Sequence, residues 1–356
     1  MTVSNHSILR TRGRSGGCAR LRNWTAALLA LTVIGTLTTA SVSRAGRYAG
    51  EFLQVAVGAR ALGMGGAYCS LADGGFAPYW NPAGSGHQQR LSLAVQHATL
   101  FELAQHEYVN LSLPLPNQAT LAFTWIRLGV EDIPVFPEPG RTSEGELQPV
   151  EDWIVLPGEF FSDAEDAFML TFAKLNQIDF DLGWQYFVVP LELPVGLNLK
   201  YIRHNLKDAT ATGMGIDMGT QLRFGLDRFL DYEPLGDFAA GLSFQNIGKT
   251  ALSWDTETKH RDHIPFNLKF GFSYRQPLSS GGTGLTLAYD RDTVYGGLNH
   301  FGAELRYRKL VALRAGVEDD ELTMGAGLQI WNLALDYAFV SYDLGNIHRI
   351  SGSVNF

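Results

Sequence analysis

The chain has 356 residues, of which 46% are hydrophobic and 12% aromatic, and it contains 39 glycines. Its formal charge of −8 at pH 7 would become about −14 without the first 45 residues, which carry six arginines and no acid. Phosphate contacts need lysine and arginine, so this acidity excludes nucleic acid as a partner. Only one cysteine, Cys69, follows residue 45, which excludes an internal disulfide; we expect it to be a small buried hydrophobic residue.

Residues 1–45 have the layout of a secretory signal peptide. The apolar stretch from Trp24 to Leu37 is followed by small residues and a cleavage point after Ala45, and it is preceded by Arg10, Arg12, Arg14, Arg20 and Arg22. An N-terminal membrane anchor is the alternative, although the stretch is short for crossing a bilayer. Cys18 precedes the apolar stretch, so it does not fit a lipid-modified cysteine. No run of about 18 apolar residues follows, so we expect an exported chain without a transmembrane helix.

Residues 46–90 precede the first regular pattern and contain "DGGFAPYWNPAG", from Asp73 to Gly84. Glycine costs conformational entropy in helices and strands, and proline removes a hydrogen-bond donor, so neither element is expected here. The stretch is nevertheless too aromatic for a linker. Its neighbour "GMGGA", from Gly63 to Ala67, lacks the full spacing of a nucleotide-binding glycine loop. We therefore expect a compact, irregular segment.

From residue 91 to the C-terminus the dominant period is two. Leu197 and Leu199, for example, alternate with Gly196 and Asn198, which predicts strands with one apolar and one polar face. Fifteen candidate strands lie near residues 91–99, 106–113, 118–129, 166–175, 178–189, 194–205, 212–225, 236–247, 264–275, 283–290, 299–308, 310–318, 321–331, 332–342 and 347–356. A barrel with both termini on one side needs an even number, so we predict fourteen strands, with the surplus candidate between 166 and 190.

A soluble sandwich and a membrane barrel both fit this alternation, with the apolar face turned inward or outward. The candidates run for roughly 9–13 residues, the length that crosses a bilayer when tilted, whereas soluble strands average about 5–6. Tyrosine and tryptophan recur at strand ends, as in an interfacial girdle. The sequence thus predicts an all-β transmembrane barrel of about 14 antiparallel strands over residues 91–356, closed because an open edge in hydrocarbon leaves backbone donors unpaired.

The last candidate strand ends on an aromatic residue. Ile350, Val354 and Phe356 share the apolar face of "HRISGSVNF". A terminal phenylalanine on the lipid-facing side resembles the signal that outer-membrane assembly machinery recognises. Together with the export signal it predicts the outer membrane of a Gram-negative envelope, with outer-membrane lipid and the barrel assembly machinery as partners.

Residues 131–166 form the longest predicted loop, on the extracellular side, with eleven Asp and Glu against one Arg. A solvated external loop is the simpler interpretation. The functional alternative is a docking element or a lid over the barrel mouth, in which Trp153, Phe160 and Phe161 contact a partner.

Motifs for catalysis or metal binding are absent from the sequence. His260 and His263 have acids nearby, but no partner motif completes a ligand set, and no loop has calcium-ligand spacing. No metalloprotease, serine-hydrolase or P-loop motif is present. We therefore predict no enzyme activity, no cofactor and no metal site. The luminal charges are expected to pair with one another, or alternatively to form a solute-selecting constriction; they are Lys200, Asp217, Arg223, Lys269, Arg275, Glu304, Arg306, Arg308, Arg314, Glu318 and Asp336.

Two parts of the chain resemble a known family. The stretch from Gly58 to Gly84 resembles the N-terminal signature of the PorV/PorQ family of outer-membrane proteins through "GAR", "GMGGA", "AD" and "YWNPAG". Near the C-terminus, "GAELRYRKLVALRAGVED" and "LALDYAFVSYDLGNIHRISGSVNF" resemble the closing strands of that family. The likeness is specific at both ends and weak from about 130 to 190. The chain departs from the family pattern in "DGGFAPYW" and in the long acidic loop.

The resemblance implies a fourteen-stranded barrel with residues 46–90 as an N-terminal plug in its lumen, and one of two functions. PorV-like members take part in type IX protein secretion, so this chain would bind or shuttle secreted cargo proteins beside the secretion translocon. The family belongs with the FadL-like transporters, which let hydrophobic small molecules cross the outer membrane passively; this is the alternative.

A plug is also physically reasonable for a barrel of this size. The lumen of about 14 strands is too wide for its own side chains to fill, and buried or wet surroundings satisfy irregular backbone where lipid could not. Phe76 and its aromatic neighbours are expected to wedge against the inner wall. A purely structural plug is the simpler interpretation. The alternative is a plug that also gates the pore, with Asp73, Tyr79, Trp80, Asn81, Pro82 and Ala83 as the residues concerned.

Overall fold

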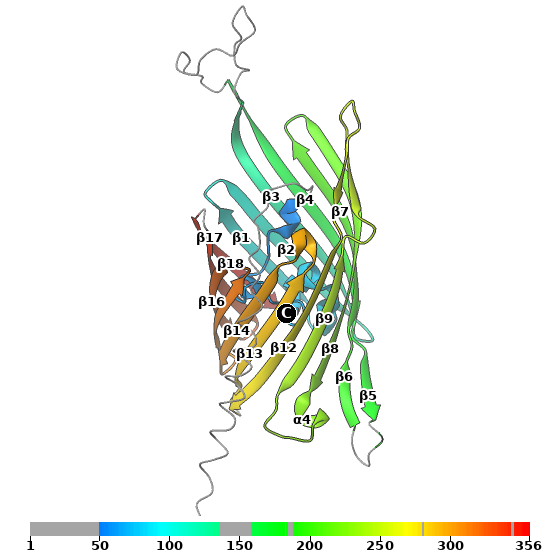
Figure 1. Ribbon diagram of the computed structural model, residues 1–356, viewed down its shortest axis with the longest axis vertical. Helices are drawn as coiled ribbons and strands as arrows, with labels where there is room; N and C mark the ends of the chain where they lie inside the picture. The colour runs from blue at the N-terminus through cyan, green and yellow to red at the C-terminus, as the bar shows by residue number, and fades with distance from the viewer. Residues whose placement is uncertain (1–49, 136–157, 182, 184–187, 280, 343–344) are drawn as a thin grey trace, which may run out of the picture. The chain divides into compact units, whose positions relative to one another are not determined.

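The structure of the protein is a computed structural model (Figure 1). It describes residues 50–135, 158–181, 183, 188–279, 281–342 and 345–356. The predicted signal peptide and Trp153 lie outside these residues. Within the described ranges, no helix is long and apolar enough to cross a membrane.

Strand segments dominate the described chain. They are β1 (Ser92–Leu100), β2 (Ala104–Leu115), β3 (Ala119–Val135), β4 (Glu159–Lys174), β5 (Gln177–Asp181), β6 (Val188–Glu192), β7 (Val195–Leu206), β8 (Ala209–Gly225), β9 (Asp237–Gln245), β10 (Thr250–Trp254), β11 (Arg261–Ile264), β12 (Asn267–Ser279), β13 (Thr283–Asp292), β14 (Asn299–Tyr307), β15 (Val311–Glu318), β16 (Glu321–Ile330), β17 (Leu333–Tyr342) and β18 (Gly345–Asn355). The helical segments are short: η1 (Glu51–Gln54), α2 (Ala59–Leu62), η2 (Gly74–Phe76), α3 (Ala77–Trp80), η3 (Pro82–His87), α4 (Leu226–Phe229) and η5 (Val294–Gly296).

The strands close into one antiparallel barrel. Consecutive wall strands pair along their length, and the last strand, β18, pairs with β1, where Val95 stands opposite Gly352. Following the pairings around the wall gives the order β1, β2, β3, β4, β7, β8, β9 and β12 to β18. This is a barrel of fourteen strands, so the predicted fold class is confirmed.

Four short segments extend the wall strands instead of adding to their number. β10 pairs with the part of β8 that lies beyond β9, and β11 pairs with β10 and leads into β12. β5 and β6 pair with each other and continue β4 and β7 as a hairpin. The predicted strand at 178–189 is therefore wrong, because the chain reverses between Asp181 and Val188. A period of two persists in both arms of a hairpin, so alternation alone did not reveal the reversal.

The two ends of the barrel are named here from the position of its first and last strands. β1 begins and β18 ends at the same end, here called the periplasmic end, and the β3–β4 connection lies at the opposite, extracellular end. β3 and β4 reach further than predicted, so residues 131–135 and 159–166 of the expected loop belong to strands. Cross-strand pairs such as Ile133 with Phe161 continue the ladder past the acidic residues.

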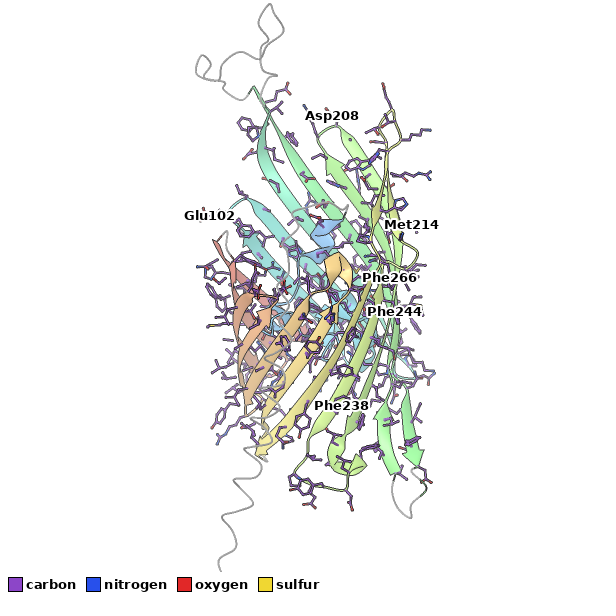
Figure 2. The ribbon with its side chains drawn as sticks, viewed as in Figure 1. Glu102, Asp208, Met214, Phe238, Phe244 and Phe266 are labelled. Atoms are coloured by element: carbon purple, nitrogen blue, oxygen red, sulfur yellow. The ribbon has the colours of Figure 1, made fainter. Side chains whose placement is uncertain are left out.

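Large apolar side chains cover the outer surface of the wall. Met214 is 77% exposed, Leu313 58% and Leu170 47%. Figure 2 shows Met214 and the labelled Phe238 and Phe244 projecting outward from neighbouring strands. Soluble monomers do not carry an exposed apolar surface of this extent, whereas strands that face lipid require it. The barrel therefore crosses a membrane, and its architecture is that of outer-membrane β-barrels.

The N-terminal residues 50–90, called the plug from here on, pack inside the barrel. Their buried apolar side chains form one hydrophobic core with the inward-facing side chains of the wall. The stretch from Asp73 to Gly84, expected to be irregular, instead forms the short helical turns η2, α3 and the start of η3. Pro78 and Pro82 stand in the first turns of α3 and η3, where a missing backbone N–H leaves no helical bond unmade.

Candidate functional site

The plug backbone lies directly against glycines on the luminal face of the wall. A Cβ added at Gly241 would lie 2.6 Å from the carbonyl oxygen of Cys69, and one added at Gly302 would lie 2.5 Å from that of Met64. Overlap with plug backbone would also occur at Gly196 and Gly316, and at Gly219 the overlap would be with the side chains of Asn81 and Pro82. Only glycine therefore lets the peptide groups of the plug reach the wall.

Asn81 connects the plug to two strands of the wall. Its side chain is fully buried, and its Nδ2 donates to the carbonyl oxygens of Thr220 on β8 at 3.1 Å and Leu242 on β9 at 3.3 Å. The same nitrogen lies 3.2 Å from the carbonyl oxygen of Cys69 within the plug. Its Oδ1 accepts from the backbone N–H of Ala83 at 3.1 Å and so caps η3. An amide is needed here because it donates and accepts at once.

Replacing Asn81 by alanine is expected to loosen the plug. The change leaves the buried amide of Ala83 without its acceptor, which costs about 1–3 kcal/mol. Asn81→Asp should be more damaging, because a carboxylate would face carbonyl oxygens. The measurement is the rate of maleimide labelling of Cys69, in a Cys18→Ser background. Cys69 is fully buried, and burial raises the pKa of its thiol. Equal labelling rates for the three proteins would contradict this account of Asn81.

Polar side chains of the wall bind the plug backbone at many points. Asn198 on β7 donates to the carbonyl oxygen of Pro78 at 2.7 Å. Asp290 on β13 accepts from the backbone amides of Tyr68 at 2.6 Å and Cys69 at 2.5 Å. Further bonds of this kind come from Gln96, Tyr108, Gln221, Gln245 and Ser351. These side chains of the wall are thus hydrogen-bond partners for backbone N–H and C=O groups of the plug, which in a helix or a sheet would pair with other backbone groups.

Tyr79 and Trp80 form the aromatic centre of the plug. Their rings meet edge to face with centroids 5.1 Å apart, and Tyr68 lies on Trp80 at 6.0 Å. The indole N–H of Trp80 donates to the carbonyl oxygen of Val57 at 2.9 Å. Nζ of Lys269 on β12 lies 5.0 Å from the centroid of the Trp80 ring, a cation–π contact with the wall.

Arg60 starts a chain of ion pairs that runs from the plug into the wall. Its guanidinium lies 2.9 Å from Asp73 within the plug and 3.2 Å from Glu304 on β14. Glu304 is buried and also pairs with Arg314 at 2.7 Å and Arg306 at 3.0 Å. Burial favours the neutral form of Asp73, but the Arg60 guanidinium outweighs it and holds the pKa of Asp73 below its usual range. The expected pairing of luminal charges is present here, and it includes the plug.

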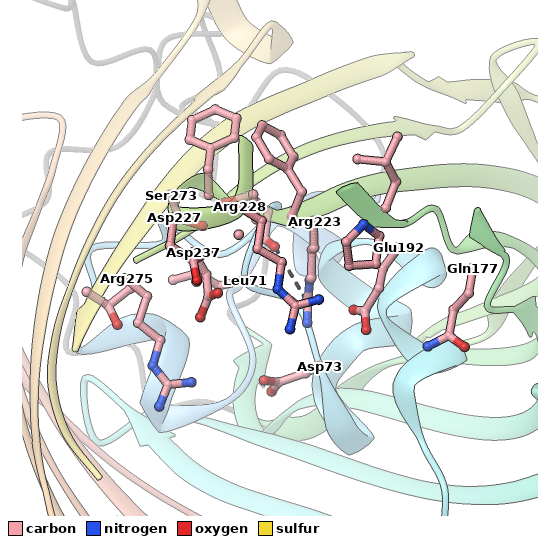
Figure 3. Close-up of a pocket in the computed structure, with 18 of the residues that line it drawn as sticks. Leu71, Asp73, Gln177, Glu192, Arg223, Asp227, Arg228, Asp237, Ser273 and Arg275 are labelled. Atoms are coloured by element: carbon pink, nitrogen blue, oxygen red, sulfur yellow. Dashed lines mark hydrogen bonds between the residues drawn. The ribbon is translucent and has the colours of Figure 1, made fainter. Parts of the chain in front are cut away.

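A cavity of about 740 Å³ lies on the periplasmic side of the plug, beside this chain of ion pairs. Figure 3 shows Arg223 and Arg228 pointing into the same space as Asp73 and Glu192. The charged residues of its lining are Arg60, Asp73, Asp179, Glu192, Arg223, Asp227, Arg228, Asp237, Arg275, Glu304 and Arg306. Both signs are well represented, so the cavity favours water and polar groups without selecting one charge.

Part of the luminal face toward the extracellular end is apolar. Along β3 the buried inward-facing residues change from Thr120 and Thr124 to Ile126. The two buried residues of η1, Phe52 and Leu53, pack into this apolar region. The wall residues of the same cluster are Tyr108, Ile126, Met169, Ile202, Leu252 and Ile264. Charged groups lie in this part of the lumen as well, since His204 on β7 pairs with Glu165 on β4 at 3.3 Å and Arg349 on β18 is buried. The lumen therefore has a charged cavity on the periplasmic side of the plug and an apolar cluster around η1 toward the extracellular end.

The residues predicted for the plug contact both the wall and other parts of the plug. Asp73 pairs with Arg60 inside the plug, and Asn81 donates to backbone carbonyls of β8 and β9. Pro82 lies against luminal glycines on β7 and β8. Phe76, expected to wedge against the wall, stacks on Tyr108 of β2 with centroids 5.1 Å apart. Whether any of them gates the pore stays a prediction.

The residues predicted outside the plug are partly described. Phe160 is 60% exposed and Phe161 is partly exposed, both on β4 near its extracellular end. Ile350 and Phe356 are 63% and 66% exposed, and Val354 is partly exposed. Their roles in partner binding and assembly stay predictions. Within the part of the chain that the structure describes, no group of three or more His, Cys, Asp or Glu residues is placed to hold a metal ion.

Arg60 was not predicted as a site residue, although the sequence carries a signal for it. Arg60 and Asp73 are the only charged residues between 55 and 73, in a segment otherwise made of small and apolar residues. Two opposite charges alone in such a segment are expected to pair, because burying either one unpaired is costly. Its partner Glu304 lies 244 residues away and could be identified only from the fold.

Comparisons with known proteins show a distant likeness in structure. No protein-family model and no curated protein matches the chain. The toluene transporter TodX of Pseudomonas putida is 12% identical, with 84% of this chain and 98% of TodX covered and a TM-score of 0.46. The toluene transporter TbuX of Ralstonia pickettii is 13% identical over 84% and 98%, with a TM-score of 0.44. A TodX deletion mutant, described as a monoaromatic hydrocarbon channel, is 11% identical over 84% and 99%, with a TM-score of 0.49. At these scores the likeness is too distant to assign a function.

Proposed function

We propose that the protein is a gated conduit for hydrophobic small molecules across the outer membrane. The observation that carries the proposal is the apolar cluster toward the extracellular end of the lumen, into which Phe52 and Leu53 of the plug pack. Water-filled porins have polar lumens. An apolar lumen instead offers apolar solutes a favourable path once the closing side chains move aside.

The plug has a part suited to staying in place and a part suited to moving. Its backbone between Gly63 and Gly86 docks against luminal glycines and is held by the side chains of the wall. Phe52 and Leu53 hold η1 by apolar packing. Displacing η1 therefore opens the apolar region without breaking the hydrogen bonds of Asn81.

The charged cavity on the periplasmic side influences which solutes pass. A molecule that leaves the apolar region enters a space of about 740 Å³ lined by arginines and acids. Water in that space solvates a polar group but not an apolar body. Solutes with an apolar body and one polar group therefore suit both regions of the lumen.

Flux of an apolar dye tests this proposal. The protein is reconstituted in vesicles whose outer leaflet is lipopolysaccharide, and entry of an apolar fluorescent dye is followed. Phe52→Ala with Leu53→Ala should raise the protein-dependent rate, because the packing they lose is worth about 2–5 kcal/mol per residue. Each 1.4 kcal/mol of that loss raises the open fraction about tenfold.

Lipid-facing residues provide the matched control for this assay. Leu93→Ala with Val95→Ala removes apolar groups of similar size from the outer face of β1, where both are exposed, and should leave the dye rate unchanged. The proposal fails if the Phe52 and Leu53 variant admits small sugars but no more dye than the parent protein. That outcome would indicate a polar channel.

A function in type IX-like secretion, implied by the PorV/PorQ resemblance, is the second candidate. Phe160 favours it, because this aromatic side chain is 60% exposed at the extracellular end of β4, where a secreted cargo protein would make contact. The dye assay separates the two candidates. A secretion component would give no protein-dependent dye entry, with or without Phe52 and Leu53.

A further inference from the structure

The β5–β6 hairpin leaves the barrel wall at its periplasmic end. β4 pairs with β3 as far as Lys174 opposite Ala119, where β3 begins. β5 continues beyond that point and, within the described residues, pairs only with β6. In Figure 1 the hairpin projects at the lower end of the barrel, beside α4. Among the described residues, therefore, no strand pairs with the edge of β5 that continues the β3 side of β4.

The hydrogen-bond pattern shows which backbone groups face this open edge. Asn176 and Leu193 exchange both of their backbone hydrogen bonds, at 3.3 and 2.8 Å. In an antiparallel ladder such pairs alternate with pairs that exchange none. Gln177, Asp179 and Asp181 therefore direct their N–H and C=O groups away from β6. Each of the three offers one donor and one acceptor to an added strand.

The open edge lies on the aqueous side of the membrane boundary. Unpaired backbone groups do not occur in hydrocarbon, and the outward-facing Lys174 at the end of β4 is exposed. A groove of about 620 Å³ lies at the start of this edge, lined by Asn117 and Gln118 of the β2–β3 turn on one side and by Gln177 and Ile178 on the other. The side chain of Gln118 donates to Oε1 of Gln177 at 3.0 Å across it. The groove is the space that a strand in line with β3 would enter.

The side chains of β5 define the chemistry of an added strand. Ile178 and Phe180 are each 47% exposed on one face of β5, and Asp179 and Asp181 alternate with them on the other. The described residues of the two arms, 177–181 and 188–192, include three acids and no lysine or arginine. Side chains directly opposite each other in a sheet interact, and opposite charges stabilise the pair. A complementary strand therefore alternates apolar and basic residues.

We propose that the free edge of β5 is a docking site for an extended segment of a periplasmic protein with alternating apolar and basic side chains. The segment adds a strand to β5 in line with β3. Its backbone bonds the outward groups of Gln177, Asp179 and Asp181. Its apolar residues cover Ile178 and Phe180, and its basic residues face the two aspartates. A second copy of this chain is a poorer occupant, because its own β5 would bring acids opposite acids.

Binding of synthetic peptides tests the proposal on the full chain. The protein is placed in nanodiscs of zwitterionic lipid, with empty nanodiscs as the blank, and fluorescence anisotropy follows labelled peptides. A peptide of alternating valine and lysine should bind at least about tenfold more tightly than one of alternating valine and glutamate. Asp179→Lys with Asp181→Lys should reverse this preference, because the charges that select the peptide are reversed.

Proline tests the backbone contribution at a single position. Asp179→Pro removes an N–H that faces the open edge and breaks no bond to β6, and the chain already carries Pro190 opposite it. It should weaken peptide binding roughly fivefold or more beyond Asp179→Ala, which removes the same charge but keeps the N–H. A valine–lysine peptide N-methylated at alternate residues should fail to bind the unmodified protein, which gives a readout that needs no variant.

Three outcomes would overturn the proposal. One is that neither peptide binds above the empty-nanodisc blank. Another is that the two lysine substitutions leave the preference unchanged, which would place the peptide elsewhere. The third is self-association of the protein that Asp179→Pro abolishes, which would identify a second copy as the occupant of the edge.

Discussion

Replacing Glu304 by glutamine is expected to lower the free energy of unfolding by about 3–5 kcal/mol. Glu304 is 3% exposed and lies within 3.2 Å of Arg60, Arg306 and Arg314. The substitution keeps the shape of the side chain but removes the one negative charge that the three guanidiniums share. In the variant, Arg314 would still pair with Asp336 and Arg60 with Asp73, so the lost ion pair would mainly destabilise the charge of Arg306.

Denaturant-induced unfolding in detergent micelles, followed by tryptophan fluorescence, measures this loss. The control is Glu107→Gln on β2, which removes an ion pair with His97 at 2.6 Å on the outer side of the wall. His97 and Glu107 stand near the extracellular turn between β1 and β2, with side chains 63% and 32% exposed, so the loss should stay below about 1 kcal/mol. Equal losses at Glu304 and Glu107 would show that the buried network does not stabilise the barrel more than a surface pair does.

Replacing Gly219 by valine is expected to undock the plug while the barrel stays closed. A Cβ at this position of β8 would overlap the side-chain oxygen of Asn81 and lie 2.9 Å from Pro82. Overpacking of this kind costs about 1–3 kcal/mol when the neighbours can shift. The plug can yield more readily than the wall, because each strand of the wall is hydrogen-bonded on both sides.

Two measurements on the Gly219 variant separate the plug from the wall. Maleimide labelling of Cys69, in the Cys18→Ser background, should be about tenfold faster for each 1.4 kcal/mol of docking energy lost. Heat-dependent migration on a detergent gel should remain that of a folded barrel. Gly129→Val on β3 is the matched control, since the nearest atoms to an added Cβ there are 3.9 Å away. Unfolding of the barrel by Gly219→Val would refute the separation of plug and wall.

The luminal glycines show which part of the site could be predicted from the sequence and which part could not. Alternation placed Gly196, Gly219 and Gly302 on the luminal face of their strands, and the structure has them there. Periodicity reports only which face a residue occupies. It contains no information on which segment of the plug lies at that height of the lumen. Glycine is required because the plug lies against these positions, and this contact is known only from the fold.

The β5–β6 hairpin shows a different limit. Its residues alternate as a wall strand does, and the sequence pattern therefore counted them as one. What distinguishes them is that the β3–β4 ladder reaches only to Ala119 opposite Lys174, so among the described strands none continues β3 beside β5. Strand pairing is a relation between segments, and a single segment's pattern does not specify its partners.

The sequence by itself determined the class of the protein. A period of two over lengths that cross a bilayer led to a barrel of fourteen strands, and the irregular aromatic segment before the first strand suited the plug that the family resemblance implies. The alternation is local, since the face that a side chain occupies depends only on neighbouring residues. The tertiary structure decided what the plug touches. Arg60 meets Glu304 across 244 residues, and the plug contacts an apolar cluster around η1 and a charged cavity on its periplasmic side, because closure of the barrel brings distant strands around one segment.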